Sequence, residues 1–142
     1  MTAATTVETR PATTDGGGVR DRIGRVLLWL AAIGAVAAAA LGAYGAVADA
    51  EPAVKVVETW RAYGFVVFAG LFALLAVRPR GHRAVWALVI FHKVAMTMTA
   101  LAYSRDAAIE GTGIVLVVDG ALSALLVLAL VLCRGWVAEP RG

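Results

Sequence analysis

Cysteine is almost absent from this sequence, in which Cys133 is the only one. One thiol cannot close an internal disulfide, and the lack of a C-x-x-C pair argues against a membrane dithiol oxidoreductase of the usual type. A thiolate cage around a metal ion is excluded for the same reason. No motif points to a particular cofactor, so the sequence assigns none.

Charged residues are also scarce, at 16% of the chain, whereas hydrophobic residues make up 61% and the mean hydropathy is +0.80. Typical soluble domains are about 45–50% apolar, so this composition predicts an integral membrane protein. The net charge of +3 does not indicate a nucleic-acid partner, because the basic residues flank apolar runs, as bilayer orientation requires. The expected partner is the lipid bilayer.

The apolar residues fall into four runs separated by short hydrophilic segments, and crossing a bilayer takes about 20 residues of helix. We therefore predict an all-α membrane protein, a four-transmembrane-helix bundle with short loops, over residues 19–136. Residues 1–18 are rich in Thr, Ala and Gly, which predicts a disordered tail, and residues 137–142 form a short C-terminal tail. The predicted spans are 26–48, 62–77, 84–103 and 113–133.

Lysine and arginine collect on one side of these spans, with nine residues there, three on the other side and Lys93 inside the membrane. Because such residues mark the cytoplasmic side, both termini are expected in the cytoplasm of a multi-pass cell (inner or plasma) membrane protein. Ala46-Val47-Ala48 resembles a signal-peptide cleavage site, but the 23-residue first run exceeds the roughly 7–15 residues of a signal peptide. An uncleaved first helix is therefore expected.

Small residues crowd the first span: Gly34 and Ala38 are spaced by four, as are Ala35 and Ala39. In lipid, this spacing lets helices approach closely, because packing replaces the hydrophobic force between helices. The pattern favours a packing helix inside the bundle or a helix that pairs with a second copy.

Two basic residues, His92 and Lys93, lie in the middle of the third apolar run, and Asp119 lies in the fourth. With antiparallel neighbouring helices, Lys93 can reach Asp119, and we predict a buried ion pair between them. Such a pair either fixes the register of two helices or marks a proton, ion or substrate site. Ser123 lies four residues after Asp119, on the same polar face.

His92 is one position before Lys93, about 100° around the helix, so the two cannot share one partner. Met96, Thr99 and Tyr103 follow His92 at helical spacing and predict a semi-polar crevice that opens outward. His92 is then a satisfied core histidine or a general acid or base. No histidine or carboxylate lies three or four residues after it, so no metal site is predicted.

At the outer end of the second span, Glu58 and Arg61 are spaced for an ion pair if the helix begins early. They would either cap the mouth of the crevice or simply lie at the membrane interface.

An Arg-x-x-Gly at the start of the second span (Arg61 to Gly64), His92 in the third and Asp119 early in the fourth resemble the small DoxX-like four-helix membrane proteins of bacteria. The resemblance covers residues 60–133 and implies a bundle, with links to quinone-linked or oxidative membrane processes. Lys93 and the small-residue first helix fall outside it. The high Ala, Val, Gly and Arg content is similar to that of actinobacterial proteins.

Three functional hypotheses follow. The first is a noncatalytic accessory or self-associating bundle with a buried Lys-Asp pair, whose partner is a second copy or a larger membrane complex. The second is a small membrane enzyme that acts on a lipophilic small molecule, a quinone or isoprenoid. In that case His92 is the acid or base, and Lys93 and Asp119 hold charge in the site. The third is an ion or small-molecule transporter built on Asp119.

Overall fold

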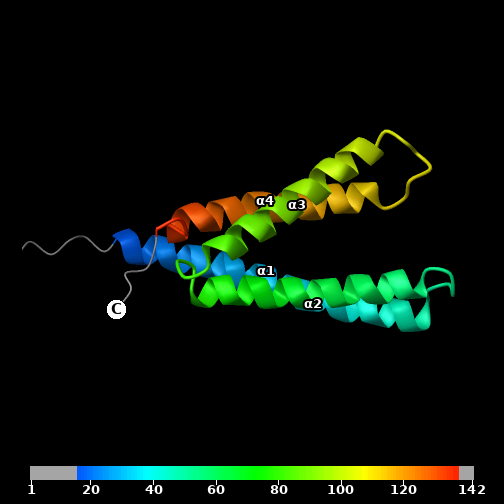
Figure 1. Cartoon of the computed structure of the whole chain (residues 1–142), viewed down its shortest axis with the longest axis horizontal. Coiled ribbons are helices and arrows are strands. Elements are labelled where there is room, and N and C mark those ends of the chain that lie inside the picture. Colours follow the sequence, from blue (N-terminus) through cyan, green and yellow to red (C-terminus); the bar gives the residue numbers. More distant parts are fainter. Residues whose placement is uncertain (1–15, 138–142) are drawn as a thin grey trace, which may run out of the picture.

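The computed structural model describes residues 16–137 and contains, within that range, four α-helices and no strand (Figure 1). Each helix is long and apolar enough to cross a membrane. This confirms the all-α class and the expected number of helices of spanning length. The helices are α1 (Gly16–Ala48), α2 (Lys55–Val77), α3 (Arg83–Tyr103) and α4 (Thr112–Cys133).

Two helices begin several residues before their apolar runs, whereas α3 and α4 begin one residue before theirs. α1 includes Gly16 to Gly18, so the predicted disordered tail is wrong for these three residues, and the rest of that tail lies outside the described range. Asp21 and Arg25 form an ion pair one turn apart, which stabilises helix ahead of the apolar run. α2 begins at Lys55, inside the expected connection, with Glu58 favourably placed in its first turn. Apolar periodicity does not detect such polar extensions.

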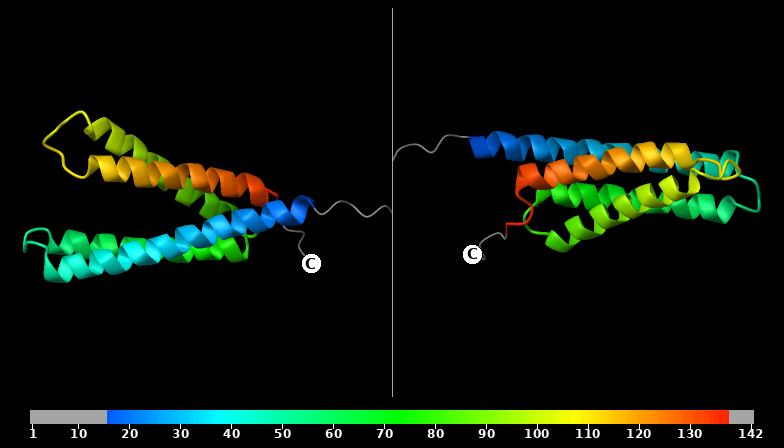
Figure 2. Two further views of the ribbon diagram at one scale, coloured as in Figure 1. Left: turned by 180° about the vertical axis from the view of Figure 1, so that it is seen from behind. Right: turned by 90° about the horizontal axis from the view of Figure 1, so that it is seen from above.

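The helices form two antiparallel hairpins, α1 with α2 and α3 with α4, which meet at one end of the molecule and diverge toward the other (Figure 2). We call the first end the terminal end, because it holds the start of α1, the turn 78–82 and the end of α4. The loop end holds the connections 49–54 and 104–111. The largest fully buried side chains of the core are Phe72, Leu28, Leu75, Leu126, Val89 and Cys133.

Close contact between α1 and α4 at the terminal end depends on Gly24. A Cβ atom built there would lie 2.5 Å from the sulfur of Cys133 and 3.2 Å from the backbone oxygen of Ala129. A side chain at this position would force the Cys133 side chain or one of the helices to shift, because real Cβ contacts are essentially never this short. Gly24 therefore sets how closely the two hairpins approach.

Asp21 adds a polar connection at the same end that the sequence analysis did not identify. Its carboxylate accepts hydrogen bonds from Arg25 at 2.9 Å and from Arg80, in the turn between α2 and α3, at 2.7 Å. Arg25 also donates to the backbone oxygen of Val77. The Asp21–Arg25 spacing of four residues was the available signal, but the contact with Arg80 depends on the fold.

The small residues of α1 are used mainly inside the α1–α2 hairpin. Ala39 and Ala46 are buried, and a Cβ added to Gly42 would touch Ala62 at 3.6 Å. Gly34 differs, because nothing lies within 4 Å of the Cβ position there. The packing role predicted for the first helix is thus confirmed for one face, and Gly34 lies on another.

Gly24→Ala is expected to lower the free energy of unfolding, because its methyl group must displace Cys133; overpacking of this kind costs about 1–3 kcal/mol. Gly34→Ala is the matched control, because it brings the same gain in helix propensity into open space. Thermal unfolding of both variants in one detergent measures the difference. Equal melting temperatures for the two variants would show that α1 and α4 are not packed at Gly24.

Candidate functional site

Lys93 of α3 and Asp119 of α4 form the buried ion pair that the sequence predicts. Lys93 Nζ donates to Asp119 Oδ1 at 2.6 Å, and the two residues are only 5% and 8% exposed. Removing either partner would leave an uncompensated charge in a medium of low dielectric constant. This contact therefore fixes the register of α3 against α4 at mid-helix.

The hydroxyl groups near the ion pair donate hydrogen bonds to backbone carbonyl oxygens rather than to the charged side chains. Thr97 donates to the carbonyl oxygen of Lys93 at 2.8 Å, and Ser123 donates to that of Asp119 at 2.7 Å. Ser and Thr hydroxyls in apolar surroundings commonly donate such hydrogen bonds to a backbone carbonyl of their own helix. Ser123, predicted as a binding residue, is thus engaged with its own helix and gives Asp119 no side-chain hydrogen bond.

Phe68 of α2 completes the site, and sequence reasoning did not identify it. Lys93 Nζ lies 4.6 Å from the centre of the Phe68 ring, a cation–π contact, which is stronger away from water. The ring of His92 lies 4.5 Å from that of Phe68, tilted by 50°. Phe68 therefore joins the α1–α2 hairpin to both basic residues of α3. One Phe among several in an apolar run carries no signal of such a role.

The buried polar groups around Lys93 and Asp119 all have hydrogen-bond partners within the chain. Across residues 16–137, every buried side-chain nitrogen and oxygen has a hydrogen-bond partner. Proton transfer to or from Asp119 would first have to break its contact with Lys93. The same range contains no group of three or more His, Cys, Asp or Glu side chains able to hold a metal ion. Because the buried polar groups are already paired, this geometry favours a structural connection.

His92 lies on the surface of α3 rather than in a crevice. It is exposed, as is Thr99, and Tyr103 is 52% exposed, while Met96 at 36% lies at the edge of the buried face. The predicted outward-opening crevice is therefore wrong for the isolated chain. The buried face of α3 runs instead through Trp86, Val89, Lys93 and Ala100, one step around the helix from His92.

Glu58 and Arg61 form the predicted ion pair in the first turns of α2. The pair lies at the loop end, and both side chains are accessible, so it is worth about 1 kcal/mol or less. The structure shows no crevice along the His92 stripe for this pair to cap, and its interfacial role stays a prediction. The structure does not bring this pair to the Lys93–Asp119 site.

Comparisons with family models, with curated proteins and with solved structures found no match to this chain. The resemblance to DoxX-like proteins stays a prediction, and the site is interpreted from its geometry.

Lys93→Met is expected to lower the free energy of unfolding by roughly 3–5 kcal/mol, because it leaves Asp119 buried without its partner. The double variant Lys93→Met with Asp119→Leu should recover most of this loss, since both charges are then gone. Chemical unfolding in detergent, arranged as a double-mutant cycle, gives the coupling energy.

The matched control is the exposed pair Glu58–Arg61, for which Glu58→Gln with Arg61→Gln should give a coupling of about 1 kcal/mol or less. A Lys93–Asp119 coupling no larger than that of the control would mean that the buried contact does not stabilise the fold.

Proposed function

We propose that this chain is a noncatalytic membrane protein that assembles with further copies of itself or within a larger membrane complex, and that the Lys93–Asp119 pair keeps its fold. The observation that carries the proposal is the exposure of His92 at the middle of a helix that is long and apolar enough to span a membrane.

In hydrocarbon, the polar nitrogens of an imidazole need a partner, because no water is present to replace it. Within residues 16–137, the ring of Phe68 lies beside His92, but no hydrogen bond to His92 is formed. A polar side chain at this depth normally faces protein or a water-filled cavity. A neighbouring helix with a hydrogen-bonding group would supply what the isolated chain lacks.

Other features support assembly. Thr99 is exposed on the same helix as His92, and hydroxyls commonly bond between helices in membranes. Gly34 offers open space for close approach of another helix. The two hairpins diverge toward the loop end (Figure 2), and α2 makes few contacts with α3, which leaves apolar surface of these helices uncovered. The proposed setting is the cell membrane with both termini cytoplasmic, and a DoxX-like bundle of actinobacterial type remains part of this proposal.

A second candidate is an enzyme acting on a quinone or isoprenoid, and it is favoured by one observation: His92 is exposed next to a buried pair of opposite charges. A lipophilic substrate diffusing in the bilayer could reach the imidazole there, which could then act as acid or base. We rank this below assembly because the buried polar groups nearby are already paired. A transporter ranks last, since Lys93 neutralises Asp119.

His92→Trp is expected to reduce the assembly to monomers or to release its partner, because the larger side chain blocks the approaching helix. Met98→Trp is the matched control, because it introduces the same side chain at another exposed position, on a different face of α3. Native mass spectrometry after mild extraction measures the mass of the assembly formed by each variant. A wild-type chain that is strictly monomeric and carries no partner would contradict the proposal.

The enzyme hypothesis gives a different pattern with the conservative variant His92→Gln, which keeps a hydrogen-bonding side chain. Assembly predicts that this variant retains the wild-type mass. Turnover of a quinone or isoprenoid by the wild type, abolished in His92→Gln with the mass unchanged, would favour the enzyme instead.

A further inference from the structure

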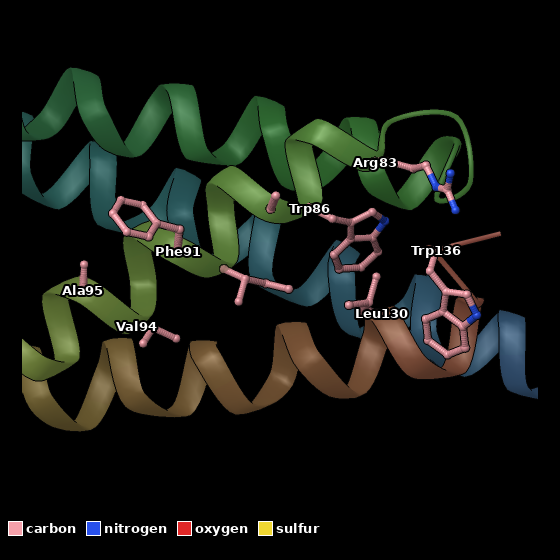
Figure 3. A pocket seen from close by; sticks show the side chains of 10 residues that line it. Arg83, Trp86, Phe91, Val94, Ala95, Leu130 and Trp136 are labelled. Carbon is pink, nitrogen blue, oxygen red and sulfur yellow. The ribbon is translucent and has the colours of Figure 1, made fainter. Parts of the chain in front are cut away.

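A hollow with a volume of about 560 Å³ lies between α3 and the end of α4, and neither Lys93 nor Asp119 lines it. Figure 3 shows Arg83, Trp86 and Trp136 at one end of it and Val94 and Ala95 at the other. We call this the α3–α4 groove. Its lining is apolar apart from the groups at the terminal end.

The floor of the groove is fixed by Trp86, which is 2% exposed and donates its indole N–H to the carbonyl oxygen of Pro79 at 2.7 Å. The chain leaves α4 through Arg134, whose φ of 51° ends the helix. Gly135 then passes directly over Trp86, where an added Cβ would lie 2.6 Å from the indole nitrogen. This close passage places Trp136 at the mouth of the groove.

The length of the groove matches one leaflet of a bilayer. It extends from Arg83 to Ala95 along α3, which is about 18 Å at 1.5 Å per residue, against roughly 15 Å for half of the hydrocarbon core. Arg83 is the first residue of α3 and lies at the terminal end, where a headgroup would be. An extended acyl chain could therefore lie along the groove with its headgroup beside Arg83.

Charge complementarity selects the type of headgroup. Arg83 is exposed, and none of the ion pairs within residues 16–137 involves it. A guanidinium group binds phosphate oxygens through two parallel hydrogen bonds, and an indole such as that of Trp136 favours the headgroup level. Among residues 16–137, no carboxylate lines the groove, so none of them repels a lipid phosphate there.

We propose that the α3–α4 groove binds one anionic phospholipid, with an acyl chain along α3 and the phosphate on Arg83. This lipid site goes beyond the proposed assembly and does not depend on it, because it requires only that the four helices span a bilayer.

The first test compares retention of phosphatidylglycerol and of phosphatidylcholine with identical acyl chains, by native mass spectrometry of the full chain. The wild type should retain one phosphatidylglycerol in preference to phosphatidylcholine. Arg83→Gln should reduce that preference roughly fivefold, the effect of one basic residue near a headgroup. Arg78→Gln is the matched control, because Arg78 is also exposed near the terminal end but does not line the groove. Equal effects of the two substitutions would overturn the phosphate contact.

The second test fills the groove. Ala87→Phe places a ring among the lining residues, whereas Ala121→Phe adds the same ring at an exposed position of α4 outside the groove. Both variants keep the core intact, which an unchanged melting temperature would verify. Ala87→Phe should remove the retained lipid of either headgroup and Ala121→Phe should not.

Two further results would overturn the proposal. One is lipid retention unchanged in Ala87→Phe. The other is a groove occupied by a second copy of the chain, in which case Ala87→Phe would lower the oligomer mass without changing lipid retention.

Discussion

The contact between Lys93 and Asp119 is the constraint on which the α3–α4 hairpin depends. Neither charge can stay in an apolar interior alone, so the two helices must keep the register that holds the side chains 2.6 Å apart. That register also determines the rotation of α3. With Lys93 turned inward to Asp119 and Phe68, His92 is turned to the surface and Trp86 into the core. The exposure of the imidazole is thus a consequence of this buried contact, and the same rotation of α3 places Trp86 at the floor of the α3–α4 groove.

The two hairpins are joined mainly at the terminal end. There Gly24 allows α1 to touch α4, and Asp21 links α1 to the turn that precedes α3. Farther along the helices, Phe68 of α2 contacts Lys93 and His92 of α3. A molecule fastened at one end leaves large helix faces uncovered, and in a membrane such faces are covered by lipid or by other helices. Assembly through His92 and lipid binding in the groove would use different parts of this uncovered surface.

The fold class and the main ion pair could be predicted from the sequence, because both depend on simple physical costs. Burying a backbone in lipid requires helices of about 20 residues, and burying Lys93 requires an acid at nearly the same depth, for which Asp119 was suitable. The crevice at His92 could not be predicted correctly, because the exposed face of a membrane helix is as apolar as its buried face. Phe68, Asp21 and Gly24 were missed since their roles depend on how the hairpins meet.

The most direct test is a measurement of the distance from the Lys93 ammonium nitrogen to the Asp119 carboxyl carbon by solid-state NMR in lipid bilayers. The chain has two lysines, so a Lys55→Arg background with nitrogen-labelled lysine and carbon-labelled aspartate leaves one lysine signal to observe. If the pair holds α3 against α4, that signal shows the strong dipolar dephasing of a direct contact and loses it in Asp119→Leu. A lysine signal without dephasing by any aspartate carboxyl, in folded protein, would contradict the ion pair and the arrangement built on it.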